Sequence, residues 1–140
     1  MLITESHNFI KQSETKEVVV SLRHDGILHV YIKPGAEINV DAHNRMNEAI
    51  NELTDSPRPF VFESGEFSSV TKEARTKAKS EEATSMATAT AIVVVNLGQR
   101  ILADYYYKIN KPTIPIKIFK NLDQATKWLT EYHMAKDQSA

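Results

Sequence analysis

One five-residue segment restricts the possible folds of this chain more than any other. Residues 91–95 read Ala-Ile-Val-Val-Val, and a strand with no polar alternation must be covered on both faces of its sheet. The segment is followed by a helical pattern, a turn with proline, an apolar strand pattern from Ile114 to Phe119 and a second helical pattern from Leu122. This order predicts a central strand in an α/β sheet.

The rest of the chain predicts a hairpin and then alternating helices and strands. Asp25-Gly26 supplies the positive φ of a tight turn between two β-rich runs, so these runs should pair antiparallel. Asp41 is the expected N-cap of the first helix. The expected elements, in order, are strands at 18–22 and 27–32, a helix at 41–54, a strand at 60–62, a helix at 71–84, a strand at 91–95, a helix from 97, a strand at 114–119 and a helix from 122.

The ends of this pattern carry further expectations. Residues 1–16 allow two interpretations, a disordered lead-in or an edge strand around Phe9 and Ile10, and the domain is expected over residues 17–136. The helix at 71–84 has only alanines to bury, so it should be the most loosely packed. Asn121 should cap the last helix, whose inward stripe is expected to be Leu122, Ala125, Trp128, Leu129 and Tyr132.

Composition excludes several classes of function. The 140 residues include 17 basic and 18 acidic side chains, a formal net charge of −1, which leaves no basic surface for nucleic acid or an anionic membrane. Cysteine is absent, which excludes disulfides and thiolate zinc sites and agrees with a reducing compartment. No apolar stretch approaches the roughly 20 residues of a membrane span. We expect a cytoplasmic protein that binds a protein or a small molecule.

Several strings of residues resemble a known family. They include the loop Glu63-Ser64-Gly65 after the third strand, Glu73-Ala74-Arg75, Arg100-Ile101-Leu102-Ala103, Asn110-Lys111-Pro112 and Lys117-Ile118-Phe119. With the initial hairpin and the terminal strand and helix, they resemble the STAS fold of the anti-sigma-factor antagonists, in its SpoIIAA-like branch, over roughly residues 17–135. The resemblance implies a single-domain mixed β-sheet, ordered β-β-α-β-α-β-α-β-α, with helices packed on it. It also implies a non-catalytic regulatory or protein-interaction module in bacterial signalling.

The same resemblance implies a regulatory hydroxyl at the start of the helix after the third strand. The antagonists carry an Asp-Ser-Ser-Gly-like turn there, and a partner kinase phosphorylates one of its serines. On this chain that hydroxyl falls at or near Thr71, with Ser69 and Ser68 as further candidates. Val70 stands where the acid should be, and Lys72 where the second serine should be. Because serine and threonine are common at helix starts, the alternative interpretation is that they only cap the helix.

Ligand sites in open α/β sheets lie beyond the carboxyl ends of the parallel strands. This rule makes Ser64, Gly65, Asn96, Gly98 and Arg100 candidates for binding a ligand or a partner, although Asn96 could also be a simple helix cap. Neither phosphate-binding glycine motif is present, so no cofactor is expected. The five histidines show no metal-ligand spacing and there is no Gly-x-Ser-x-Gly elbow, so we expect no metal and no catalytic residue.

Three successive tyrosines, 105–107, are the remaining unusual feature. Successive helical positions are about 100° apart, so Tyr107 at least should be exposed. Exposed aromatics are enriched in interfaces, which makes Tyr107 a candidate partner contact, with a homodimer as one form; a single exposed tyrosine is also ordinary. Two other functions remain open. One is a small-molecule or lipid carrier with an apolar pocket under the helix at 71–84, and the other is an enzyme with an unrecognised site.

Overall fold

The computed structural model describes residues 9–81, 85–96, 98–100 and 113–134. Most of the helix expected from residue 97 lies outside these ranges, although Gly98 to Arg100 are helical. The elements are β1 Phe9–Glu14, β2 Val18–Arg23, β3 Leu28–Ile32, β4 Glu37–Ile38, α1 Val40–Leu53, β5 Arg58–Ser64, β6 Ser69–Val70, α2 Lys72–Ser80, β7 Ala87–Val93, β8 Ile116–Phe119 and α4 Leu122–Tyr132.

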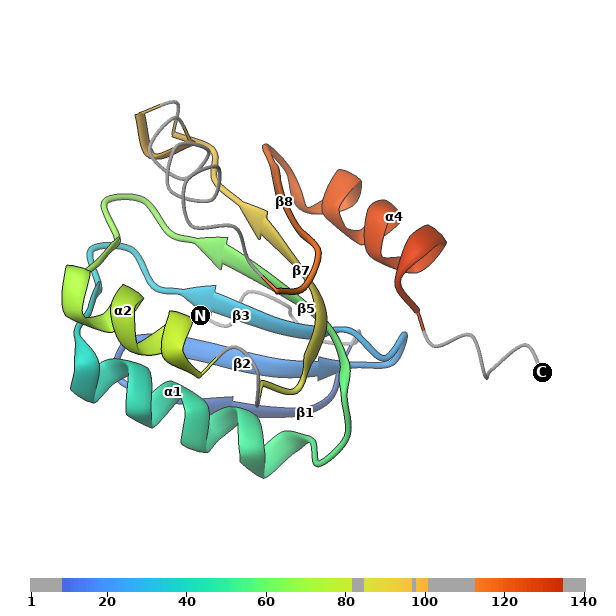
Figure 1. Ribbon diagram of the computed structural model, residues 1–140, viewed down its shortest axis with the longest axis horizontal. Coiled ribbons are helices and arrows are strands. Elements are labelled where there is room, and N and C mark those ends of the chain that lie inside the picture. Colours follow the sequence, from blue (N-terminus) through green and yellow to red (C-terminus); the bar gives the residue numbers. More distant parts are fainter. Residues whose placement is uncertain (1–8, 82–84, 97, 101–112, 135–140) are drawn as a thin grey trace.

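Six of these strands form one mixed sheet in the order β1-β2-β3-β5-β7-β8 (Figure 1). β1, β2 and β3 pair antiparallel, whereas β3 with β5, β5 with β7 and β7 with β8 pair parallel. Phe9 and Ile10 begin β1, which is an edge strand. Two further strands, β4 and β6, form a separate two-stranded parallel sheet. The expected mixed α/β fold is confirmed.

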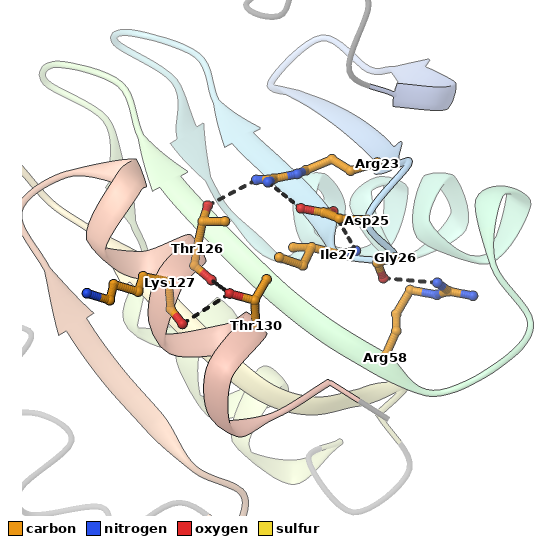
Figure 2. A network of polar contacts seen from close by, with 8 residues as sticks. All are labelled: Arg23, Asp25, Gly26, Ile27, Arg58, Thr126, Lys127 and Thr130. Carbon is orange, nitrogen blue, oxygen red and sulfur yellow. Dashed lines mark hydrogen bonds and ion pairs between the residues drawn. The ribbon is translucent and has the colours of Figure 1, made fainter. Parts of the chain in front are cut away.

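The turn of the hairpin between β2 and β3 is tied to two other elements (Figure 2). Gly26 has φ +90°, as the Asp-Gly turn requires, and the Asp25 carboxylate accepts from the Ile27 amide at 3.1 Å. Arg23 lies 2.5 Å from Asp25 and donates to Thr126 of α4 at 3.3 Å. Arg58 of β5 donates to the Gly26 carbonyl at 3.0 Å. These bonds fix the end of the sheet opposite the carboxyl ends of the parallel strands.

The two faces of the sheet carry separate hydrophobic cores, with α1 and α2 on one side and α4 on the other (Figure 1). Side chains alternate along a strand, so Phe60 belongs to the core under α1 and Val61 to the core under α4. Leu129 of α4 is completely buried in the second of these cores. α2 buries only Ala74, so it is weakly anchored, as its alanine-only pattern predicts. None of the described helices is long and apolar enough to cross a membrane.

The strand that contains the apolar run differs from its prediction. β7 covers residues 87–93 instead of 91–95, because it starts at Ala87 opposite Arg58 of β5. Val93 is 2% exposed, whereas Val95 is 70% exposed. Both neighbouring strands end before Val95 can pair, β5 at Ser64 and β8 at Phe119, so the chain leaves the sheet there. The prediction that Val95 lies in the buried strand is wrong.

Two details of the helices also differ from the predictions. The N-cap of α1 is Asn39, whose side chain accepts from the Ala42 amide at 2.9 Å, and Asp41 lies inside the first turn. In α4 the cap Asn121 is confirmed, but Tyr132 is 63% exposed and does not belong to the inward stripe. Ala125 and Leu129 are the buried residues of α4, and Leu122 and Trp128 pack partly buried against the same core.

The position at which β7 ends can be tested by replacing one valine inside the strand and one beyond it. Val93→Ala should lower the free energy of unfolding by about 2 kcal/mol, because it removes two buried methyl groups and leaves a cavity. Val95→Ala should change it by less than about 0.5 kcal/mol, since that side chain already meets solvent. Urea unfolding of both variants measures the difference. Equal losses would contradict the position of the strand end.

Candidate functional site

Two loops meet at the carboxyl ends of the parallel strands. Residues 65–71, called here the β5–α2 loop, follow β5, and residues 94–100 follow β7. The Gln99 side chain donates to the Ser68 carbonyl at 2.8 Å and so joins the two loops. The Asn96 side chain accepts from the Gln99 amide at 3.0 Å, which confirms the capping alternative for Asn96. Open α/β sheets bind ligands at this end.

Backbone hydrogen bonds hold the β5–α2 loop against the segment that leaves β3. The Gly65 amide donates to Ile32 O at 2.7 Å, and Gly35 donates to Glu66 O at 2.8 Å. The Ser69 amide donates to Ala36 O at 2.9 Å and Thr71 to Ile38 O at 3.0 Å, which form the β4–β6 pair. A loop with this many backbone partners has little freedom to rearrange.

Gly65 makes this arrangement possible. A Cβ added at residue 65 would lie 2.5 Å from Ile32 O, 2.6 Å from Pro34 N and 2.8 Å from Lys33 C. All three are backbone atoms, so no side-chain rotation could relieve the contacts. Gly65 therefore serves as a close-packing residue between two backbone segments, a role that glycine alone can fill.

The fixed loop displays apolar side chains to solvent. Phe67 has φ +63°, a left-handed conformation that costs a non-glycine residue about 1–3 kcal/mol, and it is 82% exposed. Val70 of the same loop is 37% exposed, and Val95 of the joined loop is 70% exposed. The two segments that the Gln99–Ser68 hydrogen bond joins therefore expose three apolar side chains, and exposed apolar side chains are common at binding surfaces.

The helix that follows the loop is held at both ends. At its start the Thr71 hydroxyl accepts from the Ala74 amide at 3.1 Å, which confirms the capping role of Thr71. At its end Glu81 Oε1 lies 2.8 Å from His43 Nε2 of α1 and accepts from Asn47 at 3.3 Å. Lys77 lies 3.1 Å from the other oxygen of Glu81. The hydrogen bond from His43 is the main cause that lowers the pKa of Glu81.

All but one of the nine site residues predicted from the sequence lie within the described part of the chain. Eight of them lie at the ends of β5 and β7 or in the segments that follow: Ser64, Gly65, Ser68, Ser69, Thr71, Asn96, Gly98 and Arg100. The hydrogen bond from Gln99 to Ser68 joins the two segments, and a role of the eight residues in binding stays a prediction. Among the three hydroxyl candidates, Ser68 is buried, whereas Ser69 is exposed in β6. Tyr107 lies outside the described residues. Sequence reasoning missed Phe67, although a phenylalanine between Glu66 and Ser68 in a polar loop is a signal that could have identified it.

The described residues offer little support for a buried ligand or metal. A groove along α2 is lined by Lys72, Glu73, Thr76, Lys77 and Ser80, and these side chains differ from the apolar pocket that a carrier would need. His29 is buried and lies 2.9 Å from Glu63, so it points into the protein beside one carboxylate. No group of three potential metal ligands occurs among the described residues.

Comparison with known proteins gives a family and a fold. A family model described as a domain of unknown function, DUF7793, matches residues 20–133. No curated protein matches the chain. The chain is similar to the crystal structure of an uncharacterized protein of the DUF3478 family, with a SpoIIAA-like fold, from Shewanella loihica PV-4, at 10% identity and a TM-score of 0.60, over 85% of this chain and 99% of that one. This similarity confirms the expected fold.

A second similar structure is a protein of unknown function from Arthrobacter sp. FB24. It shares 24% identity over 85% of this chain and 97% of that one, with a TM-score of 0.29. A score this low does not indicate a common arrangement of the chain. The fold assignment therefore depends on the Shewanella loihica protein and on the strand order described above.

The packing role of Gly65 predicts that adding one methyl group at this position lowers the stability of the fold. Gly65→Ala should lower the free energy of unfolding by about 1–3 kcal/mol, because its Cβ would overlap three backbone atoms. Gly98→Ala is the matched control, since among the described residues its Cβ would meet only the Asn96 side-chain oxygen at 3.2 Å. Thermal unfolding of both variants measures the difference, and a Gly65→Ala variant as stable as the wild type would refute the close-packing role.

The contact between Glu81 and His43 predicts a pH dependence of stability. Because the folded state lowers the pKa of Glu81 below 4.5, this carboxylate stabilises the fold above that pH, and the contribution is lost as the pH falls through the folded pKa. The wild type should exceed Glu81→Gln in stability by less than about 1 kcal/mol at pH 6, since the pair is solvent-screened. The difference should shrink as the pH falls below 4.5 and the carboxylate takes up its proton.

Urea unfolding across this pH range measures the effect, with Glu48→Gln as the control. Glu48 is an exposed glutamate of α1 with no contact to α2 among the described residues, so its replacement should leave the pH dependence unchanged. A stability difference for Glu81→Gln that stayed constant from pH 6 to pH 3 would count against the contact.

Proposed function

The chain belongs to the DUF7793 family of domains of unknown function, and we propose that it is a STAS-like module that acts by binding another protein. The observation that carries this proposal is the display of Phe67, 82% exposed, on a loop fixed by backbone hydrogen bonds. A fold alone does not determine a function. The proposal therefore rests on the chemistry of this loop, and the SpoIIAA-like fold is consistent with it.

The energetics of the loop favour a protein partner. Burying a phenylalanine side chain contributes about 1.5–3 kcal/mol, and aromatic residues are among those that dominate binding energy at interfaces. Backbone hydrogen bonds hold the residues on both sides of Phe67 before binding, so little backbone entropy is lost when a partner covers its ring. Val70 and Val95 are further exposed apolar side chains on the two segments that the Gln99–Ser68 hydrogen bond joins. The partner should offer an apolar pocket for the ring.

The remaining parts of the proposal concern the role of this binding. We assign it a regulatory, non-catalytic role in the bacterial cytoplasm, supported by the near-neutral charge and the absence of cysteine. Phosphorylation of Thr71, Ser69 or Ser68 stays a prediction, as does a homodimer through Tyr107. The carrier alternative gains no support from the groove along α2, whose lining is polar.

The proposal can be tested by photo-crosslinking in the organism that encodes the protein. A photoreactive phenylalanine analogue at Phe67 should give a covalent adduct with one polypeptide, because this side chain is expected to enter the interface. The same analogue at Ile10 is the matched control, since Ile10 is 55% exposed on the edge strand β1. Adducts at Ile10 together with none at Phe67 would contradict the proposal.

The purified polypeptide then allows an affinity measurement. Phe67→Ala should weaken its binding by about 30-fold, the equivalent of a 2 kcal/mol hot spot, while Ile10→Ala should bind like the wild type. Circular dichroism should show both variants folded, since neither side chain is buried. Unchanged binding by Phe67→Ala would show that the loop is not the interface.

A further inference from the structure

Among the described residues, β6 pairs with backbone on one side, that of β4. The amides of Ser69 and Thr71 donate to Ala36 O and Ile38 O of the β4 segment. In an extended strand the N–H and C=O of successive residues point to opposite edges. The carbonyl of Ser68 and both backbone groups of Val70 therefore lie on the outer edge of β6, away from β4.

Within residues 9–81, 85–96, 98–100 and 113–134, the groups on this outer edge have no backbone partners. The Ser68 carbonyl accepts from the Gln99 side chain at 2.8 Å, and the Val70 carbonyl accepts from the Arg75 side chain at 2.6 Å. The Val70 amide has no acceptor within the described part of the chain, and its residue is 37% exposed. Along its outer edge, β6 thus presents an acceptor, the Ser68 carbonyl, then a donor, the Val70 amide, and then a second acceptor, the Val70 carbonyl. Each of the two carbonyls is hydrogen-bonded to a side chain.

We propose that the outer edge of β6 binds an extended segment of the partner protein, which adds a strand beside Val70. This inference rests on the function proposed above and specifies the chemistry of the partner. An extended backbone offers a donor, an acceptor and a donor at the spacing of these three groups. A helix has its backbone groups bonded internally and could not supply this pattern.

The edge is already in place for such pairing. β6 is fixed to β4, and Gly65 fixes the start of the loop to the backbone of residues 32–34. The incoming segment needs only to displace the side chains of Gln99 and Arg75 from two carbonyls. Its own side chains would lie near Phe67 and Val70, so alternate residues of the segment should be apolar. Strand edges that lack a neighbouring strand pair with other chains in this way in other proteins.

One substitution isolates the backbone donor. Val70→Pro removes the Val70 N–H, which takes no part in the β4–β6 ladder, and Ser69 before it is already extended, as a residue before proline must be. Val70→Thr is the matched control, because it keeps the N–H and the β-branched shape. Both variants should remain folded by circular dichroism.

The probe is a set of linear eight-residue peptides selected on the wild-type protein from a displayed random library. The selected peptides should alternate apolar and polar residues and should bind Val70→Pro at least tenfold more weakly than the wild type. Binding to Val70→Thr should change by less than threefold. Fluorescence polarisation with labelled peptide measures each affinity.

A second measurement does not depend on the proline variant. In the wild type, saturation with a selected peptide should slow hydrogen exchange of the Val70 amide at least tenfold, as NMR can record. Selection that yields no peptide protecting this amide, or peptides that bind Val70→Pro as well as the wild type, would overturn the inference. If the crosslinked partner is lost by Phe67→Ala but retained by Val70→Pro, the proposed function stands and strand addition fails.

Discussion

The close approach of Gly65 to the backbone of residues 32–34 is the constraint on which the candidate site depends. Because Gly65 has no Cβ, the β5–α2 loop can lie against the exit of β3 and form four backbone hydrogen bonds with it. Each such bond is worth about 1 kcal/mol net, and together they exceed the roughly 1–3 kcal/mol of strain at Phe67. The loop can therefore hold an exposed aromatic ring in an unfavourable backbone conformation.

The region combines this rigid loop with a loosely packed helix. The loop is fixed by backbone partners, whereas α2 buries only Ala74 and is attached at its ends through Thr71 and Glu81. Local stability should therefore fall along the chain from the loop into the helix. A partner that docks on Phe67 would meet a preformed surface, while the neighbouring helix keeps the freedom to adjust.

Most of the fold could be predicted from the sequence, because its signals are local. The Asp25-Gly26 turn, the Asn121 cap and the inward Leu129 each follow from residue chemistry within a few positions. The end of β7 could not, because it depends on where β5 and β8 stop, which is a property of pairing between distant segments.

The candidate site was only partly predictable. The rule for parallel strands placed the two loops together, and Thr71 was identified as a cap. The two-residue strands β4 and β6 are too short to give a pattern, so their pairing and the outer edge of β6 could not be foreseen. The packing role of Gly65 was also hidden, since its contacts lie about 30 positions away in the sequence.

Amide hydrogen exchange of the unbound protein tests the central claim most directly, since it reports the bonding of each residue in the loop. If the β5–α2 loop is held as described, the amides of Gly35, Gly65, Ser69 and Thr71 should exchange at least about 100-fold more slowly than the amide of Phe67, which donates to no described group. Exchange of all five at the rate of an unstructured peptide would show that the loop is not fixed to β3, and the account of the site would fail.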